Sequence, residues 1–237
     1  MVVEIPWPLE QVVASRKSEA RVSQVLHRKG EWGRGRDLPA DRLREIEDAC
    51  NRNGMNLFQA LSMRRSMLRA MPGGMNKVNR SSAMGSNQGQ QDIARLLEEA
   101  TVQYIKDTIT RKVGKKSASS YFLTEREQLD EMRRGTRPRG PTPDILFLKP
   151  VKIQGKQVHW IDCKMFYGSA MMASKRHIPN GKLEKTADRY ASHFGGKGAF
   201  VFGRGFCHDL RPLIRNAVLL DSAPLDTSAI EDFQNDG

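Results

Sequence analysis

Two apolar runs joined by a glycine turn place the strongest constraint on how this chain folds. The first run is residues 145–148, the second is residues 157–164, and Gly155 lies in the turn between them. Short apolar runs separated by a glycine turn are typical of a β-hairpin. Apolar residues at helical spacing precede the hairpin at residues 91–112 and follow it at residues 182–194. This order of elements predicts an α/β fold in which helices flank a mixed central sheet.

Composition divides the chain into four regions. Residues 1–71 have the apolar spacing of helices, and residues 72–90 are rich in Gly, Ser and Asn, as linkers are. Residues 91–220 contain the hairpin and its flanking helices, and residues 221–237 contain acids and no base. We therefore predict a small helical domain, a linker, an α/β domain and a disordered acidic tail.

The N-terminal region contains two short predicted helices on either side of a turn at Gly54. Asn56 and Gln59 form a capping-box pattern that begins the second helix. Two helices in this arrangement are typical of a helix-turn-helix, whose second helix contacts nucleic acid. An ordinary helical hairpin with a solvated basic face fits equally well. The side chains that would contact nucleic acid on the second helix are Arg64, Arg65 and Arg69.

Charge and cysteine content narrow the class of protein. The formal net charge is +12, which favours a polyanionic partner because neutralised phosphates release condensed counterions. A basic surface that only maintains solubility is the alternative.

The three cysteines are far apart and none has CxxC spacing, so neither a zinc site nor a disulfide framework is expected. No apolar stretch is long enough to cross a membrane, and we expect an intracellular protein without membrane association.

Three charged residues at the ends of the predicted hairpin strands form a candidate catalytic site. Asp144 precedes the first strand, and Asp162 and Lys164 lie near the end of the second. Residues two apart on a strand project to the same face, so Asp162 and Lys164 share a face and Cys163 points to the other. Pairing of the two strands brings Asp144 beside them. Two carboxylates and an ammonium group are therefore expected on one face of the sheet.

This combination of groups suits the hydrolysis of phosphodiester bonds. Carboxylates are ligands for Mg²⁺, with Mn²⁺ as a possible substitute, and the carbonyl of Cys163 is a further candidate ligand. A bound metal polarises the phosphate and lowers the pKa of a water molecule, while Lys164 stabilises developing negative charge. A surface Asp–Lys pair without catalytic role is the alternative interpretation.

Residues beyond the second strand are candidates for contact with nucleic acid. Lys175 and Lys185 follow the candidate site and could track phosphates without reading sequence. Tyr190 is a candidate for the same surface, and packing between a helix and the sheet explains it equally well.

Four segments between residues 121 and 210 match a known family, and they are residues 122–129, 141–147, 151–164 and 193–206. The second contains the tripeptide Thr-Pro-Asp that ends at Asp144, and the third ends in an acidic-x-Lys triplet at Lys164. On these segments the chain resembles the TPD-motif family of the PD-(D/E)xK nuclease superfamily.

The resemblance implies a restriction-endonuclease-like fold and a divalent-metal site at Asp144, Asp162 and Lys164. It also implies a Mg²⁺-dependent deoxyribonuclease activity, a location in the nucleus or in nucleus and cytoplasm, and a protein partner of the codanin kind. A further metal-binding acid is expected on the first helix of the α/β domain. Asp92, Glu98 and Glu99 are all in range, and Glu98 is slightly favoured.

Two departures from the family pattern give weight to a second interpretation. Ser169 stands where the family has Asp, and Thr186 stands where a Gln is common. A nuclease-fold adaptor that binds DNA or a partner protein without cutting is therefore the main alternative. An RNA-binding helical module is a third, less favoured because no aromatic-rich stacking motif is present.

Overall fold

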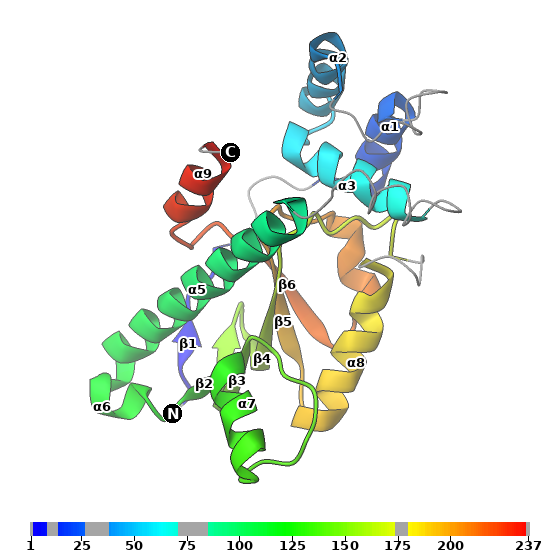
Figure 1. Cartoon of the computed structure of the whole chain (residues 1–237). Helices are drawn as coiled ribbons and strands as arrows, with labels where there is room; N and C mark the ends of the chain where they lie inside the picture. The colour runs from blue at the N-terminus through cyan, green and yellow to red at the C-terminus, as the bar shows by residue number, and fades with distance from the viewer. Residues whose placement is uncertain (1, 9–13, 27–37, 71–84, 174–179, 236–237) are drawn as a thin grey trace.

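A mixed six-stranded sheet forms the centre of the protein (Figure 1). The computed structural model describes residues 2–8, 14–26, 38–70, 85–173 and 180–235. Strands pair in the order β1-β3-β4-β5-β6, with β2 also pairing with β3. The strands are β1 Glu4–Ile5, β2 Phe122–Thr124, β3 Ile145–Ile153, β4 Lys156–Lys164, β5 Gly198–Phe202 and β6 Ala217–Asp221.

The predicted hairpin is confirmed as β3 and β4, which pair antiparallel. Gln154 and Gly155 connect them with positive φ angles of 49° and 70°, and two such residues make the type I′ turn that suits a twisted hairpin. Beyond the hairpin, β4, β5 and β6 run parallel to one another. The sheet is therefore mixed and flanked by helices, which confirms the restriction-endonuclease-like α/β fold.

Helices cover both faces of the sheet. They are α1 Arg16–Leu26, α2 Ala40–Asn51, α3 Leu57–Ala70, α5 Gly85–Val113, α6 Lys115–Ala118, α7 Glu125–Arg134, α8 Leu183–Phe194 and α9 Ser228–Asn235. Figure 1 shows the long α5 crossing one side of the sheet and α8 lying on the other. In the described part of the chain, no helix combines the length and apolarity needed to cross a membrane.

Alternation along the strands divides the apolar residues between two cores. Ile161 and Val201 face α5 and pack with Leu97 in one core. Trp160 and Phe200 face α8 and pack in the other. Because successive residues of a strand point to opposite faces, Asp162 and Lys164 lie on the α8 face with Trp160. The sheet therefore presents these two charged side chains beside an aromatic core.

The first residues of the chain belong to the sheet. Glu4 and Ile5 form β1, which lies parallel to β3. The indole of Trp7 donates a hydrogen bond to the carbonyl of Asp221 at 3.0 Å, so the N-terminal segment also reaches the last strand. The helical region predicted for residues 1–71 thus begins with a strand. Pairing with a distant strand, which local sequence does not reveal, explains the difference.

The three N-terminal helices contribute to the core on the α8 side of the sheet. Val22, Ile46 and Met63, one from each helix, are buried in the same core as Trp160 and Phe206. The capping box at the start of α3 is confirmed, because Asn56 and Gln59 exchange hydrogen bonds of 3.1 and 2.9 Å. The linker predicted at residues 72–90 lies mostly outside the described residues, and α5 begins within it at Gly85. The domain boundaries stay a prediction.

The acidic C-terminal segment is helical where the sequence predicts disorder. Helix α9 spans Ser228–Asn235 and contacts α5. Leu225 and Ile230 are buried in the core that α5 covers. Two apolar anchors therefore order a segment whose average composition is that of a disordered tail.

Buried polar side chains tie the N-terminal helices to the segment that follows Lys164. The N–H of Tyr167 donates to the hydroxyl of Ser62 in α3 at 3.0 Å, and the N–H of Met171 donates to the carboxylate of Glu19 in α1 at 3.1 Å. Glu19 is 0% exposed. Burial raises the pKa of the Glu19 carboxyl above its usual range. The helices therefore help to hold the segment that leads away from the candidate site.

We expect Glu19→Ala to destabilise the protein by about 1–3 kcal/mol, because the buried N–H of Met171 loses its acceptor. Glu19→Gln keeps an acceptor and should be tolerated. Since the carboxyl pKa is raised on folding, the wild type loses stability as pH rises above the unfolded value of 4.5. Glu19→Gln lacks this loss, so its melting temperature should exceed that of the wild type increasingly as pH rises. Thermal melts from pH 4 to pH 8 measure this, and parallel curves would contradict it.

Candidate metal centre

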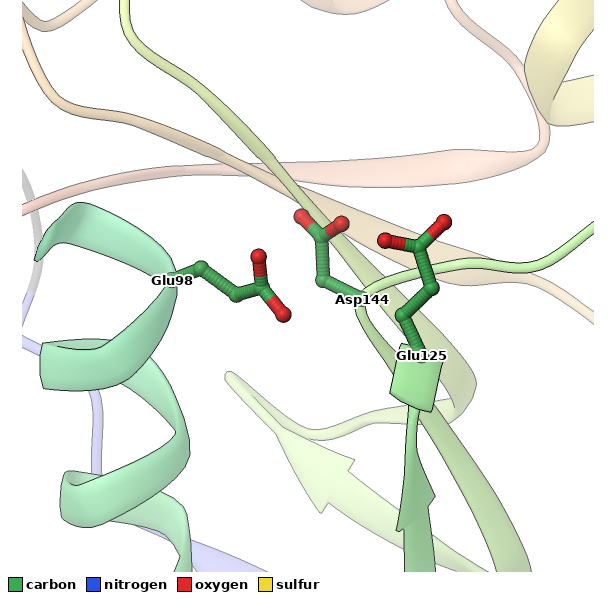
Figure 2. Close-up of side chains that lie close together, drawn as sticks. All are labelled: Glu98, Glu125 and Asp144. Carbon is green, nitrogen blue, oxygen red and sulfur yellow. The ribbon is translucent and has the colours of Figure 1, made fainter. Parts of the chain in front are cut away.

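Three carboxylates from separate elements converge at one edge of the sheet. Glu98 lies on α5, Glu125 is the first residue of α7, and Asp144 directly precedes β3. One ligand oxygen from each lies within 4.8 Å of the others. Figure 2 shows the three carboxylates directed toward one another. Among the residues that the structure describes, this is the group of potential ligands close enough to share a metal ion.

Local hydrogen bonds place Glu125 in this group. A capping box at Thr124 begins α7, with the Thr124 N–H donating to the Glu127 carboxylate at 2.8 Å. The Glu125 N–H donates to the carbonyl of Asp144 at 3.0 Å. The hydroxyl of Thr142 donates to the Glu125 carboxylate at 2.9 Å. The end of β2 and the approach to β3 therefore set the position of Glu125 together.

Asp162 and Lys164 form an ion pair beside the three carboxylates. Lys164 Nζ lies 2.6 Å from Asp162 Oδ2, and the two side chains are 22% and 8% exposed. Ile145 pairs with Ile161, so the antiparallel register places Asp144 across from Asp162. Lys164 Nζ also lies 5.6 Å from the centre of the Phe200 ring. The pair is thus held against the sheet and directed to the side on which Asp144 lies.

Cys163 contributes its backbone to the site and its side chain to the opposite face. Its N–H donates to Asp144 Oδ2 at 2.5 Å. Its thiol donates to the hydroxyl of Thr101 on α5 at 3.4 Å. The alternation of side chains that the sequence predicts for β4 is therefore present. The role of the Cys163 carbonyl as a metal ligand stays a prediction.

The carboxylates repel one another in a partly buried site. Burial, and after it the charge of Asp162, raises the pKa of Asp144 well above its usual range. The hydrogen bond from the Cys163 N–H and the charge of Lys164 oppose this rise. Burial also raises the pKa of Glu98, and the charge of Glu125 adds to it. The raised pKa values of Asp144 and Glu98 mean that these two acids favour either a proton or a nearby cation, and hard carboxylate oxygens suit a divalent cation.

The three candidates for the additional acid on the first helix of the α/β domain differ in where they lie relative to Asp144. Glu98 faces Asp144, as the sequence slightly favours. Glu99 is exposed and pairs with Arg95 at 3.7 Å, away from the group. Asp92 lies nearer the start of α5 than Glu98 and is not part of the group of three carboxylates.

Glu125 is absent from the sequence-based set of site residues. It follows Thr124, the N-cap of α7, and an acid at this position is common for helix stability alone. The capping box would have located it at the first helical position. Only the pairing of β2 with β3, in which Thr124 lies opposite Ile145, places it beside Asp144.

The residues predicted to contact nucleic acid are dispersed. Arg64 and Arg65 lie half-buried on α3, and Lys185 is exposed on α8. Arg69 is on α3, but its side chain is outside the described part, and Lys175 lies outside the described residues. Their contact with nucleic acid stays a prediction.

Tyr190 packs between α8 and the sheet. It is 5% exposed, and its ring lies edge-on to Trp160 with a centroid distance of 4.9 Å. Its hydroxyl donates to the carbonyl of Thr142 at 3.4 Å. Of the two roles that the sequence allows, the structure favours packing, and the side chain supports the chain just before Asp144.

Comparisons with known proteins agree with the resemblance noted from the sequence. Residues 66–223 match the family model described as "Protein of unknown function TPD sequence-motif". A Danio rerio protein named CDAN1-interacting nuclease 1 is 27% identical over 148 residues, covering 58% of this chain and 47% of that protein. The chain thus spans about half the length of this curated relative, and no solved structure gives a match. Since the family model matches more than half of the chain, the protein belongs to the TPD sequence-motif family.

Proposed function

We propose that this protein is a metal-dependent nuclease that hydrolyses phosphodiester bonds in DNA. The observation that carries the proposal is the convergence of Glu98, Glu125 and Asp144 beside the ion pair of Asp162 and Lys164. Its relative in Danio rerio is named a nuclease, which supports the same activity.

Each residue of the site has a distinct role in this proposal. The carboxylates of Glu98, Glu125 and Asp144 fit a divalent cation, because hard oxygen ligands with unneutralised charge suit Mg²⁺ or Mn²⁺. A cation held there supplies a Lewis acid for the phosphate and lowers the pKa of a water molecule. Lys164 places its ammonium group where negative charge builds during the reaction. Asp162 holds that ammonium group in position at 2.6 Å and lies next to the cation-binding carboxylates.

The proposal extends to substrate, partner and location. A net charge of +12 supports a polyanionic substrate such as DNA. The relative is named for its interaction with CDAN1, and we include a protein partner of that kind. A location in the nucleus, or in nucleus and cytoplasm, is part of the same proposal.

Cleavage of labelled single-stranded, duplex and branched DNA tests the proposal. The wild type is incubated with Mg²⁺, Mn²⁺ or EDTA, and compared with Asp144→Asn and Glu125→Gln. We expect cleavage that requires metal, is lost in Asp144→Asn and is reduced in Glu125→Gln. Glu99→Gln is the matched control, since it neutralises an exposed acid next to Glu98 that lies outside the group.

Metal binding gives a second readout that does not depend on cleavage. A cation that binds only the folded state raises the melting temperature in proportion to the logarithm of its concentration. The wild type and Glu99→Gln should show this rise, and Asp144→Asn should not. If the wild type and all variants bind DNA equally and none cuts any substrate, the adaptor interpretation replaces the nuclease.

A further inference from the structure

A basic cavity lies at the end of the sheet opposite the candidate metal centre. Its volume is about 220 Å³. The residues that line it are Gln154, Lys156, Lys197, Arg211, Arg215, Ala217, Val218 and Leu219. We call it the strand-start pocket, because it lies where β4, β5 and β6 begin. The metal centre lies near the other end of β4, because Asp144 lies across from Asp162, six residues or ~20 Å beyond Lys156 at ~3.3 Å per residue.

The topology brings cations from three neighbouring strands into this pocket. Lys156 is the first residue of β4, Lys197 immediately precedes β5, and Arg215 lies two residues before β6. Because these strands are parallel, their beginnings meet at the same end of the sheet. Arg211 adds a fourth cation, and its guanidinium packs 5.3 Å from the centre of the Phe206 ring.

Three of these cations lack a neutralising acid. Within the described parts of the chain, no carboxylate forms an ion pair with Lys156, Lys197 or Arg215. Two acids lie in the neighbourhood and are engaged elsewhere. Asp188 accepts a hydrogen bond from Asn216 at 2.8 Å, and Glu4 accepts one from the Gly155 N–H at 3.4 Å. The pocket therefore carries a net positive charge toward solvent.

Size and spacing favour one segment of a polymer as the occupant. The volume of 220 Å³ is below the roughly 300–1,000 Å³ that enclose a whole drug-sized ligand. Neighbouring strands lie about 4.8 Å apart, so cations from three strands spread over about 10 Å. Each strand of a duplex carries one phosphate per about 3.4 Å of helix axis, so about 10 Å of axis spans about three phosphates of one strand. Lys156, Lys197 and Arg215 are exposed, so phosphates can reach their charges from solvent.

We propose that the strand-start pocket binds the sugar–phosphate backbone of a nucleic-acid strand, as a second contact remote from the metal centre. The proposal rests on nucleic acid being the partner in the proposed function, and it does not require that the protein cuts it. A basic pocket at this distance positions the polymer without reading its sequence.

Fluorescence anisotropy with the full chain in EDTA tests the pocket without any cleavage. The probe is a labelled DNA duplex of about 20 base pairs, longer than the ~20 Å between the pocket and the metal centre at ~3.4 Å per pair. The pocket variant is Lys156→Gln with Arg215→Gln. The matched control is Lys106→Gln with Lys112→Gln, which removes two exposed cations from α5 and changes the net charge equally.

We expect the pocket variant to bind the duplex at least tenfold more weakly and the control within about twofold of the wild type. Each phosphate contact that is lost should reduce the slope of log affinity against log salt by about one, so the pocket variant should lose about two. Equal losses in both variants would overturn the proposal. So would a pocket variant that binds DNA normally but no longer binds an acidic peptide, since the pocket would then serve a protein partner. If the wild type cuts DNA and the pocket variant binds DNA normally, the pocket proposal is wrong and the proposed function is unaffected.

Discussion

Lys164→Ala should reduce metal-dependent DNA cleavage by about 10²–10³-fold, the usual cost of removing one group that stabilises developing charge. Metal binding should persist, because the substitution leaves the three candidate metal ligands Glu98, Glu125 and Asp144 in place. Single-turnover cleavage with saturating Mg²⁺ measures the first effect, and a thermal shift with Mg²⁺ measures the second. Lys106→Ala, which removes an exposed lysine of α5, is the control and should cut as the wild type does.

The ion pair complicates this substitution, and a second variant separates catalysis from folding. Removing Lys164 leaves Asp162, which is 8% exposed, without its partner, and a lone buried charge destabilises a protein by several kcal/mol. Asp162→Asn combined with Lys164→Gln replaces the pair by two neutral groups of similar shape. We expect this variant to melt near the wild type and still fail to cut. A variant that folds and cuts normally would exclude Lys164 from the reaction.

Gly198→Ala should cost about 3 kcal/mol and reduce the yield of folded protein. A Cβ at Gly198 would lie 1.9 Å from Cδ2 of Trp160, far inside van der Waals contact. Trp160 is fully buried and cannot withdraw, because Tyr190 and Phe200 pack on it with centroid distances of 4.9 and 5.3 Å. Overpacking usually costs about 1–3 kcal/mol, and a rigid indole beside backbone lies at the upper end. Chemical denaturation followed by circular dichroism measures the change.

Gly195→Ala provides the comparison three residues earlier. Its Cβ meets nothing within 4 Å, and only the left-handed φ of 74° opposes the substitution. A cost of about 1–2 kcal/mol is expected there. If Gly198→Ala were no more destabilising than Gly195→Ala, the close packing of Trp160 against β5 would be wrong.

Much of the fold could be predicted because its signals are local. The glycine turn located β3 and β4, and the capping box at Asn56 and Gln59 located the start of α3. The shared face of Asp162 and Lys164 followed from the two-residue repeat of a strand. What escaped prediction depends on contacts between distant segments. Strand β1 has only two residues and exists because β3 pairs with it.

The residues of the candidate site also differ in whether the sequence alone could identify them. Asp144 and Glu98 could be named from the sequence, because one lies in a recognisable tripeptide and the family resemblance implies an acid on the first helix of the α/β domain. Glu125 could not, because its proximity to Asp144 depends on a three-residue strand pairing across the sheet. The acidic tail was predicted to be disordered from its average composition, which conceals the two apolar residues that dock α9.

The pairing of the first strand also has a consequence for how the chain matures. Glu4 finds its partner at Lys152, and the indole of Trp7 bonds to Asp221, 214 positions later. During synthesis from the N-terminus, β1 therefore cannot pair before β3 is made, and Trp7 cannot form its hydrogen bond before β6 is made. Contacts so distant in sequence slow folding, because a large loop must close before they form. The N-terminal strand therefore docks late in folding. A nascent chain that stalls before β6 can pair β1 with β3 but lacks the hydrogen bond from Trp7 to Asp221.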